Sequence, residues 1–165
     1  VKYFSDKKRP TLVVATRTLH ILILQSYIGK VVDPEKIRIL FSHHSTEERD
    51  ETFEWFKSTD GSVLITPLVK EGVSLPELAS GVIADHIVNP EVANQVVGRF
   101  IRKKPTGRNE AEIVTFIDRQ HPRLQRNGVA LMTEMEKIRG YSFIWPVTTP
   151  DSISTGKLFE AADAL

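Results

Sequence analysis

The chain has 165 residues, of which 41% are hydrophobic, enough to bury one substantial core but too few for two full-sized domains. Its 22 lysines and arginines nearly balance its 21 aspartates and glutamates, so any contact with nucleic acid must come from local clusters of basic residues. The absence of cysteine excludes disulfides, thiolate nucleophiles and cysteine-ligated metals.

Short apolar runs rich in β-branched residues alternate with helical patterns along the chain. In chain order, the patterns predict strand Thr11–Ala15, helix Thr18–Ile28, strand Ile37–Phe41, helix Thr46–Lys57, strand Val63–Ile65, strand Gly81–Ala84, helix Pro90–Arg102, strand Ile113–Ile117 and helix Pro122–Arg139. Gly29 closes the first of these helices, a capping box from Ser45 to Glu48 opens the second, and Gly128 interrupts the last.

This alternation predicts an α/β fold of parallel βαβ units, with a twisted sheet, helices on both faces and a ligand site at the carboxyl ends of the strands. We assign residues 1–145 to this domain. After Trp145 the composition shifts to Pro, Thr, Ser and Asp, so residues 146–165 are predicted to form a tail or a short peripheral helix.

No apolar run is long enough to span a membrane, and the start of the chain is polar and basic instead of signal-like. We therefore expect a soluble intracellular protein without a membrane partner, in the cytoplasm, the nucleoid or a eukaryotic nucleus. The first residue is valine and not methionine, which favours a segment excised from a longer protein.

The predicted helix that starts at Pro90 carries a polar arc. At about 100° per residue, Gln95, Arg99 and Arg102 fall within one narrow arc. The opposite side is apolar and can pack on the sheet, through Ala93, Val96, Val97, Phe100 and Ile101. Two guanidiniums beside an amide suit a polyphosphate, because each planar group can donate two hydrogen bonds to phosphate oxygens. An ordinary solvated helix face is the alternative, and spacing alone favours it.

Two strand ends carry candidate phosphate contacts. Thr66 directly follows a predicted strand, and Gly72 in the next loop permits close approach of a ligand to the backbone; a plain loop with Thr66 bonded locally is the alternative. Thr16, Arg17 and Thr18 lie at a strand–helix junction, where exposed amides and a guanidinium can bind an anion. The alternative there is that Thr16 or Thr18 is simply the N-cap.

Adjacent histidines at 43 and 44 raise the question of a metal site. Side chains of neighbouring residues on a strand end point apart, and the sequence indicates no carboxylate partner for His43 or His44. We therefore predict no metal ligands in this chain.

Taken together, these segments resemble the motif series of the C-terminal lobe of superfamily 2 helicases. Thr11–Arg17 is similar to motif IV, and Val63–Glu77 is similar to motif V, with its threonine and glycine at the family's separation. His44–Arg49, followed by Phe53, resembles the histidine, E-E-R helix and phenylalanine that precede motif V. Gln95–Arg102 matches the Q-x-x-G-R-x-x-R form of motif VI, which is quite specific.

The resemblance covers residues 10–143 and extends past motif VI. Lys103–Arg108, the run Ile113–Asp118 and the pair His121-Pro122 are similar to the pattern of XPB-like and phage or restriction-type DNA translocases. This branch favours DNA over RNA as the nucleic-acid partner.

The resemblance implies a RecA-like three-layer domain that forms one half of a helicase or translocase. Arg99 and Arg102 would be arginine fingers facing the γ-phosphate of ATP bound on a first lobe. Gln95, Gly72 and Ser74 would lie beside the nucleotide, although the family often has aspartate at the position of Ser74. The implied contacts with the backbone of the tracked strand come from Thr66, Thr16, Arg17 and Lys70.

The motifs of a first lobe are missing, because the chain contains neither G-x-x-x-x-G-K-[ST] nor a D-E-x-x box after a strand. ATP and Mg²⁺ would therefore be held mainly by an N-terminal RecA-like lobe absent from this chain, and the chain alone is not expected to hydrolyse ATP. Two alternatives are a stand-alone nucleic-acid-binding module anchored by Arg102–Arg108 and a regulator that docks on another helicase's first lobe. The shared arc of Gln95, Arg99 and Arg102 favours the helicase lobe over a pure binder.

Overall fold

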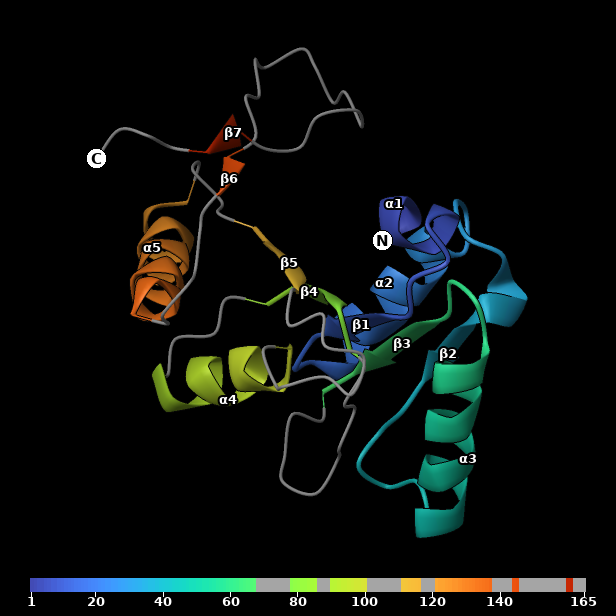
Figure 1. The fold of residues 1–165 in the computed structure, drawn as a ribbon. Helices are drawn as coiled ribbons and strands as arrows, with labels where there is room; N and C mark the ends of the chain where they lie inside the picture. The colour runs from blue at the N-terminus through green and yellow to red at the C-terminus, as the bar shows by residue number, and fades with distance from the viewer. Residues whose placement is uncertain are drawn as a thin grey trace.

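Five parallel strands form the sheet at the centre of the described fold, in the order β2-β3-β1-β4-β5 (Figure 1). The computed structural model describes residues 1–67, 78–85, 90–100, 111–116, 121–137, 144–145 and 160–161. In chain order the strands are β1 (Thr11–Val14), β2 (Ile37–Ile39), β3 (Val63–Thr66), β4 (Ser80–Ile83) and β5 (Glu112–Thr115). The central strand is β1, whose Thr11 is in register with Val63 on one side and Ser80 on the other.

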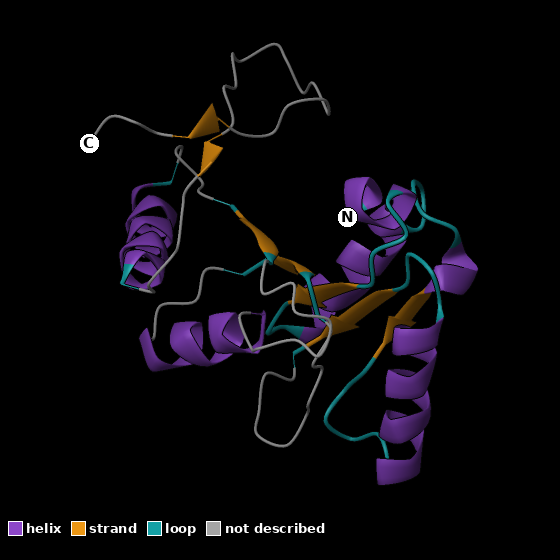
Figure 2. Ribbon diagram, viewed as in Figure 1, coloured by secondary structure: helices purple, strands orange, loops and turns teal. Residues whose placement is uncertain are grey.

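Helices follow β1, β2, β4 and β5 in the chain (Figure 2). The longer helices are α2 (Thr18–Ile28) between β1 and β2, α3 (Thr46–Ser58) between β2 and β3, α4 (Pro90–Phe100) between β4 and β5, and α5 (Pro122–Glu136) after β5. The smaller elements are α1 (Lys2–Asp6), a 3-10 helix (Pro34–Lys36) and the antiparallel pair β6 (Ile144–Trp145) and β7 (Glu160–Ala161).

The sheet has a hydrophobic core on each face. Leu12 and Val14 of β1 belong to one core and Val13 to the other, because side chains alternate across a strand. The first core is completed by α3, α4 and α5, through Phe56, Phe100 and Leu131. The second is completed by α1 and α2 on the opposite face (Figure 1), through Phe4, Ile21 and Ile28. The predicted three-layer α/β fold with helices on both faces of a parallel sheet is confirmed.

The starts of two helices test the sequence predictions. At α3 the capping box is confirmed, since the Ser45 N–H donates to Glu48 Oε2 at 2.7 Å and the Glu48 N–H donates to Ser45 Oγ at 3.2 Å. The same Ser45 N–H lowers the pKa of Glu48. At α2 the N-cap is Arg17, without a side-chain capping bond, so the expectation that Thr16 or Thr18 is the N-cap is wrong.

Other boundaries differ from the sequence predictions or stay untested. The helix α5 runs through Gly128, so the predicted interruption is wrong. Most of residues 146–165 lie outside the described residues, so the boundary between the domain and its tail stays a prediction. Within the described ranges, no helix combines the length and the apolar composition that crossing a membrane requires.

Candidate nucleic-acid interface

The carboxyl ends of parallel strands meet at one edge of a sheet, and three of them carry the residues of the candidate site. Thr16 and Arg17 follow β1, Thr66 ends β3, and Asp85 follows β4. Because β1 lies between β3 and β4, residues that are distant in sequence become neighbours here. This is the edge at which open parallel sheets bind their ligands.

Asp85 ties the ends of β1 and β4 to the first turn of α2. Its Oδ2 accepts hydrogen bonds from the backbone N–H of Thr16 and from the Thr16 hydroxyl, the latter at 2.5 Å. Its Oδ1 lies 2.5 Å from Nδ1 of His20. The side chains of His20 and Asp85 are 34% and 16% exposed, so the cluster is partly shielded from water yet reachable from outside.

The carboxyl group of Asp85 is ionised at neutral pH. Burial raises the pKa of Asp85, but the hydrogen bonds from Thr16 and His20, with the charge of His20, outweigh burial and hold this pKa below its usual range. A carboxylate has no hydrogen to donate, so Nδ1 of His20 carries the hydrogen that joins the two groups. In the neutral form of the ring, a hydrogen on Nδ1 leaves the free lone pair on Nε2.

These bonds restrict what Thr16 can do. Both of its donors, the backbone N–H and the hydroxyl, are directed to Asp85, so only the hydroxyl lone pairs remain for a ligand. The predicted contact of Thr16 with a phosphate requires a donor, and these donors would first have to leave Asp85. Arg17 is different: its side chain is exposed, and we find no hydrogen bond or ion pair for it among the described residues.

Thr66 is 2% exposed, and its hydroxyl donates to the carbonyl oxygen of Leu40 at 2.8 Å. That bond joins the end of β3 to the residue that follows β2. The geometry favours the local role left open as the alternative for Thr66, so its contact with a phosphate backbone stays a prediction without support from these distances.

The helix α4 packs with the orientation that its pattern predicts. Val96, Val97 and Phe100 are buried in the core of the sheet, while Gln95 is exposed. Arg99 lies one turn after Gln95 on the same helix, and its side chain lies outside what the structure describes. The polar arc of this helix is therefore confirmed at Gln95 and stays a prediction at Arg99.

Four other predicted site residues lie outside the described residues, namely Lys70, Gly72, Ser74 and Arg102. Their roles toward nucleotide and nucleic acid stay predictions.

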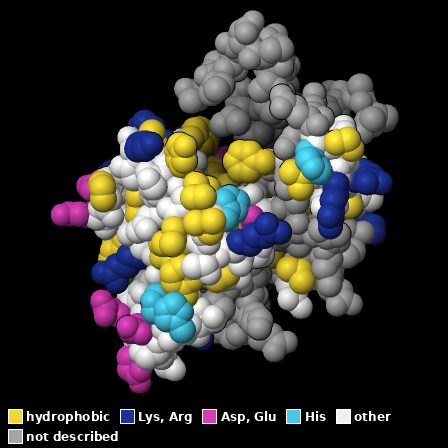
Figure 3. Space-filling model, turned by 180° about the vertical axis from the view of Figure 1, so that it is seen from behind, with side chains coloured by type: hydrophobic (Ala, Val, Ile, Leu, Met, Phe, Trp, Pro, Cys, Tyr) yellow, Lys and Arg dark blue, Asp and Glu magenta, His cyan; other side chains and the backbone are white. Residues whose placement is uncertain are grey.

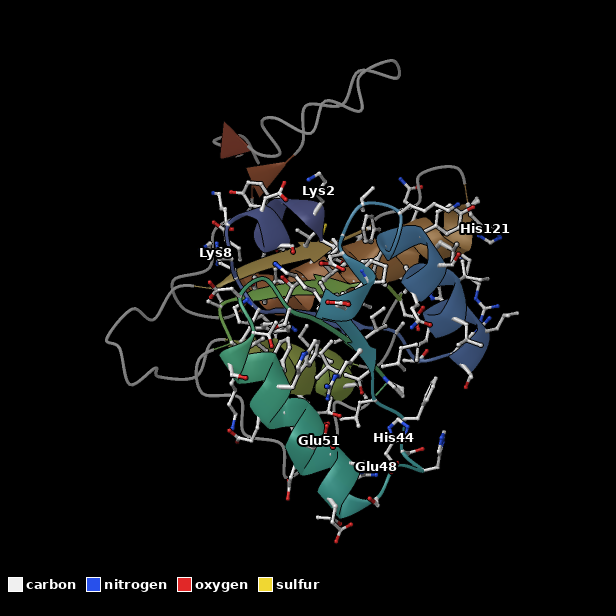
Figure 4. The ribbon with its side chains drawn as sticks, turned by 90° about the vertical axis from the view of Figure 1, so that its right-hand side faces the viewer. Lys2, Lys8, His44, Glu48, Glu51 and His121 are labelled. Carbon is white, nitrogen blue, oxygen red and sulfur yellow. The ribbon has the colours of Figure 1, made fainter. Side chains whose placement is uncertain are left out.

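An aromatic cluster follows β2 at the same edge. The rings of Phe41 and His43 are stacked, with centroids 5.4 Å apart and an angle of 16° between their planes. The Phe41 N–H donates to Nδ1 of His44 at 3.1 Å, and Figure 4 shows His44 near Glu48 at the start of α3. Among the described residues, no three histidines, cysteines or carboxylates gather closely enough to hold a metal ion.

Hydrophobic side chains lie beside the candidate site on the outer surface of α2. The exposed residues are Leu19, Leu22, Ile23 and Tyr27. On the face seen from behind, hydrophobic side chains gather around histidine and basic side chains (Figure 3).

Sequence reasoning missed Asp85 and His20. A signal for Asp85 was available, because it directly follows the predicted strand Gly81–Ala84 and therefore lies at the same edge as the turn after Thr11–Ala15. Nothing in the sequence marked His20, which stands in the middle of an apolar helical pattern.

The fold is that of a RecA-like α/β lobe. The chain belongs to the family described as the helicase conserved C-terminal domain, whose model matches residues 2–104. No curated protein sequence matches the chain.

Three similar solved structures agree with this family. S. cerevisiae Dbp5 bound to RNA and ADP BeF3 is 16% identical with a TM-score of 0.61, over 83% of this chain and 35% of that one. The C-terminal part of the Fun30 ATPase domain is 18% identical with a TM-score of 0.62, over 76% and 40%. T4 UvsW is 16% identical with a TM-score of 0.59, over 81% and 30%. The chain thus spans well under half the length of each, and its resemblance to a superfamily 2 C-terminal lobe is confirmed.

The expected preference for DNA over RNA is wrong. It depended on one branch of the superfamily, and no finding supports that branch over others. The similar structure of Dbp5 contains RNA, so likeness to this fold gives no preference for DNA.

Proposed function

We propose that the chain is the C-terminal lobe of an ATP-dependent superfamily 2 helicase or translocase that acts on RNA. The observation that carries this proposal is the packing of α4, which buries Val96, Val97 and Phe100 and leaves Gln95 exposed. A helix held in this way can present Gln95 and Arg99 to a nucleotide bound on another lobe, and we assign Arg102, two residues after α4 in the sequence, to the same nucleotide. The family and the fold agree with this role.

In this proposal the chain supplies cations and a partner lobe supplies the rest of the ATP site. Arg99 and Arg102 donate to the γ-phosphate and stabilise the charge that develops during its transfer. Mg²⁺ neutralises phosphate charge in such sites, and the described residues offer no cluster of carboxylates to hold it. We therefore assign the metal to the first lobe, together with the P-loop that this sequence lacks.

The RNA backbone would lie along the carboxyl edge of the sheet. Arg17 supports this assignment, because its exposed guanidinium stands at an N-terminus of α2 that no side chain caps. RNA is favoured because the similar structure of Dbp5 contains that polymer. We assign a contact with RNA to Lys70, and positions beside the nucleotide to Gly72 and Ser74.

The test uses a protein in which this chain is joined to a first lobe. Arg99→Ala or Arg102→Ala should slow ATP hydrolysis by roughly 10³-fold or more, the loss typical of a missing arginine finger, while RNA affinity without ATP changes little. Arg→Lys at either position should stay strongly impaired, because a point charge cannot replace the planar guanidinium at two phosphate oxygens.

Arg123→Ala is the matched control, since Arg123 is an exposed arginine on α5 outside the proposed site. It should leave hydrolysis unchanged. Loss of RNA binding with intact hydrolysis in Arg99→Ala and Arg102→Ala would show that these arginines contact RNA, and the proposed role would be wrong.

A further inference from the structure

We propose that His20 makes this edge selective for RNA, because its Nε2 accepts a hydrogen bond from a ribose 2′-hydroxyl and Asp85 holds the ring in the form that can do so. The inference rests on the proposed RNA contact and identifies the chemical group that this contact recognises. His20 would contact the RNA directly, whereas Asp85 is a positioning residue.

The first step is the geometry around Asp85. The backbone N–H of Thr16 can only donate, so Oδ2 must accept, and the Thr16 hydroxyl donates to the same atom at 2.5 Å. Oδ1 is left for Nδ1 of His20, 2.5 Å away. Three hydrogen bonds from two residues, Thr16 and His20, thus fix the carboxylate, and the carboxylate in turn fixes the imidazole.

The second step is the identity of the atom left for a ligand. Nδ1 carries the hydrogen that points to Asp85, so in the neutral form of the ring Nε2 is an acceptor on the far side of the ring from Asp85. We find no other hydrogen bond to the His20 ring among the described residues, and its side chain is 34% exposed. A phosphate oxygen also lacks a hydrogen at neutral pH, so Nε2 needs a ligand that donates.

The third step concerns the groups that surround Nε2 of His20. The Thr16 hydroxyl, whose hydrogen is directed to Asp85, offers a second acceptor, and Arg17 adds an exposed cation next in sequence. Two acceptors beside a guanidinium suit one nucleotide of RNA, whose ribose donates a hydroxyl and whose phosphate takes the cation. The 2′-hydroxyl repeats at every ribonucleotide and is absent from DNA, so the contact is independent of sequence and specific for the polymer.

The test compares three probes of equal length on the wild-type chain by fluorescence anisotropy: oligouridine RNA, the same RNA with 2′-O-methyl groups, and oligodeoxyuridine DNA. A length of roughly 15 nucleotides covers the footprint of a single-strand site. The RNA should bind roughly three- to tenfold more tightly than either other probe, the value of one hydrogen bond. The 2′-O-methyl probe keeps the ribose oxygen but replaces its hydrogen with a methyl group, so this oxygen can no longer donate.

Two variants locate the effect. His20→Phe keeps a ring but removes Nε2, so RNA affinity should fall to the level of DNA while DNA affinity stays unchanged. Asp85→Asn should also weaken RNA binding, although removing a negative charge by itself would tighten binding of both polymers. Nitrogen-15 NMR of His20 should show hydrogen on Nδ1 in the wild type and a shift away from that tautomer in Asp85→Asn.

Asp60→Asn is the charge-matched control, because Asp60 is exposed and precedes β3 at the amino edge of the sheet. It should change neither affinity nor the His20 spectrum. Equal binding of RNA, 2′-O-methyl RNA and DNA by the wild type would overturn the role of His20 and leave the proposed function standing. Equal losses on RNA and DNA in His20→Phe would show a phosphate contact instead. If the wild type binds neither polymer, both proposals are wrong.

Discussion

At the carboxyl edge of the sheet, two threonine hydroxyls donate hydrogen bonds to acceptors within the domain. The Thr66 hydroxyl donates to the Leu40 carbonyl, and the Thr16 hydroxyl donates to Asp85. A threonine at the end of a strand is therefore ambiguous as a sign of phosphate binding, because its short side chain also reaches neighbouring backbone and side-chain acceptors. Substitutions can separate the two roles, since one acts on stability and the other on affinity.

Thr66→Val keeps the shape of the side chain and removes its hydroxyl. Chemical denaturation should show a loss of about 1–3 kcal/mol in the free energy of unfolding, because the buried Leu40 carbonyl loses its Thr66 donor. RNA affinity of the folded chain should be unchanged. Thr66→Ser keeps the hydroxyl and should lose less stability. Unchanged stability with loss of RNA binding in Thr66→Val would restore the phosphate contact assigned from the sequence.

Arg17 is a described residue at this edge whose side-chain donors are available to a phosphate. Arg17→Gln should weaken binding of RNA and reduce the salt dependence of the binding constant by about 0.7 in slope, the contribution of one phosphate on a single strand. The free energy of unfolding should stay the same, since the side chain is exposed. Titrations at several salt concentrations measure both affinity and slope.

Lys8→Gln is the matched control for Arg17→Gln. Lys8 precedes β1 at the amino edge, and Figure 4 shows it far from His44 and Glu48, which follow β2. The two substitutions remove the same charge at opposite edges of the sheet. An equal change in salt slope in both variants would mean that RNA binds through the overall field of the protein and not at the carboxyl edge.

At the scale of elements, α4 depends on a glycine in the strand beneath it. A Cβ added at Gly81 of β4 would overlap the ring of Phe100, which is fully buried at the end of α4. Gly81 thus lets the helix that bears Arg99, one of the proposed arginine fingers, approach the sheet. Gly98 on the same helix has nothing within 4 Å of its missing Cβ.

Gly81→Ala and Gly98→Ala should therefore have opposite effects. The first should reduce the free energy of unfolding by about 1–3 kcal/mol, the usual cost of overpacking a core. The second should raise it by up to about 1 kcal/mol, because alanine favours a helix interior over glycine. Combining Gly81→Ala with Phe100→Leu should cost less than the sum of the single losses. Additive losses would mean that Gly81 and Phe100 do not pack together.

Periodicity predicted most elements because their burial follows the pattern of the sheet. The helix Thr18–Ile28 has the predicted bounds, and the Ser45 capping box has the predicted reciprocal bonds. The helix Lys2–Asp6 escaped prediction because its five residues are mostly polar and too few to show a helical period. The interruption predicted at Gly128 was wrong because a glycine only lowers the helix propensity of a segment, and the packing of α5 offsets this loss.

The site was less predictable than the fold because it depends on strand order. Thr16 and Asp85 are 69 positions apart and meet only because β1 and β4 are neighbours. Local motifs identify residues one segment at a time, so they indicated Thr16 and Arg17 but not the carboxylate that binds Thr16. The same motifs assigned Thr66 to a phosphate, although its hydroxyl donates to the carbonyl of Leu40, the residue after β2.

At the scale of the whole molecule, the proposed function makes the chain one part of a two-part ATP site. It spans 35% of the Dbp5 chain with RNA and 30% of UvsW. In the proposed function, it contributes the guanidinium groups of Arg99 and Arg102 and a surface that binds RNA at the carboxyl edge of the sheet. Neither of these contributions can polarise the β-phosphate or orient the attacking water, because P-loop and D-E-x-x residues perform those functions.

The chain alone should therefore show negligible ATP hydrolysis, with or without RNA, in a phosphate-release assay. Joined to a first lobe, the same chain should hydrolyse ATP faster when RNA is present, because both ligands favour the closed arrangement of the two lobes. A flexible linker raises the effective concentration of each lobe near the other to the millimolar range, so separate lobes mixed at micromolar concentration should recover far less activity. Any hydrolysis by the isolated chain must be repeated with the Arg99→Ala variant, because this substitution does not change the activity of a contaminating ATPase. Robust, RNA-stimulated hydrolysis by the pure chain that disappears in Arg99→Ala would mean that this lobe holds a complete ATP site, and the two-part mechanism would be wrong.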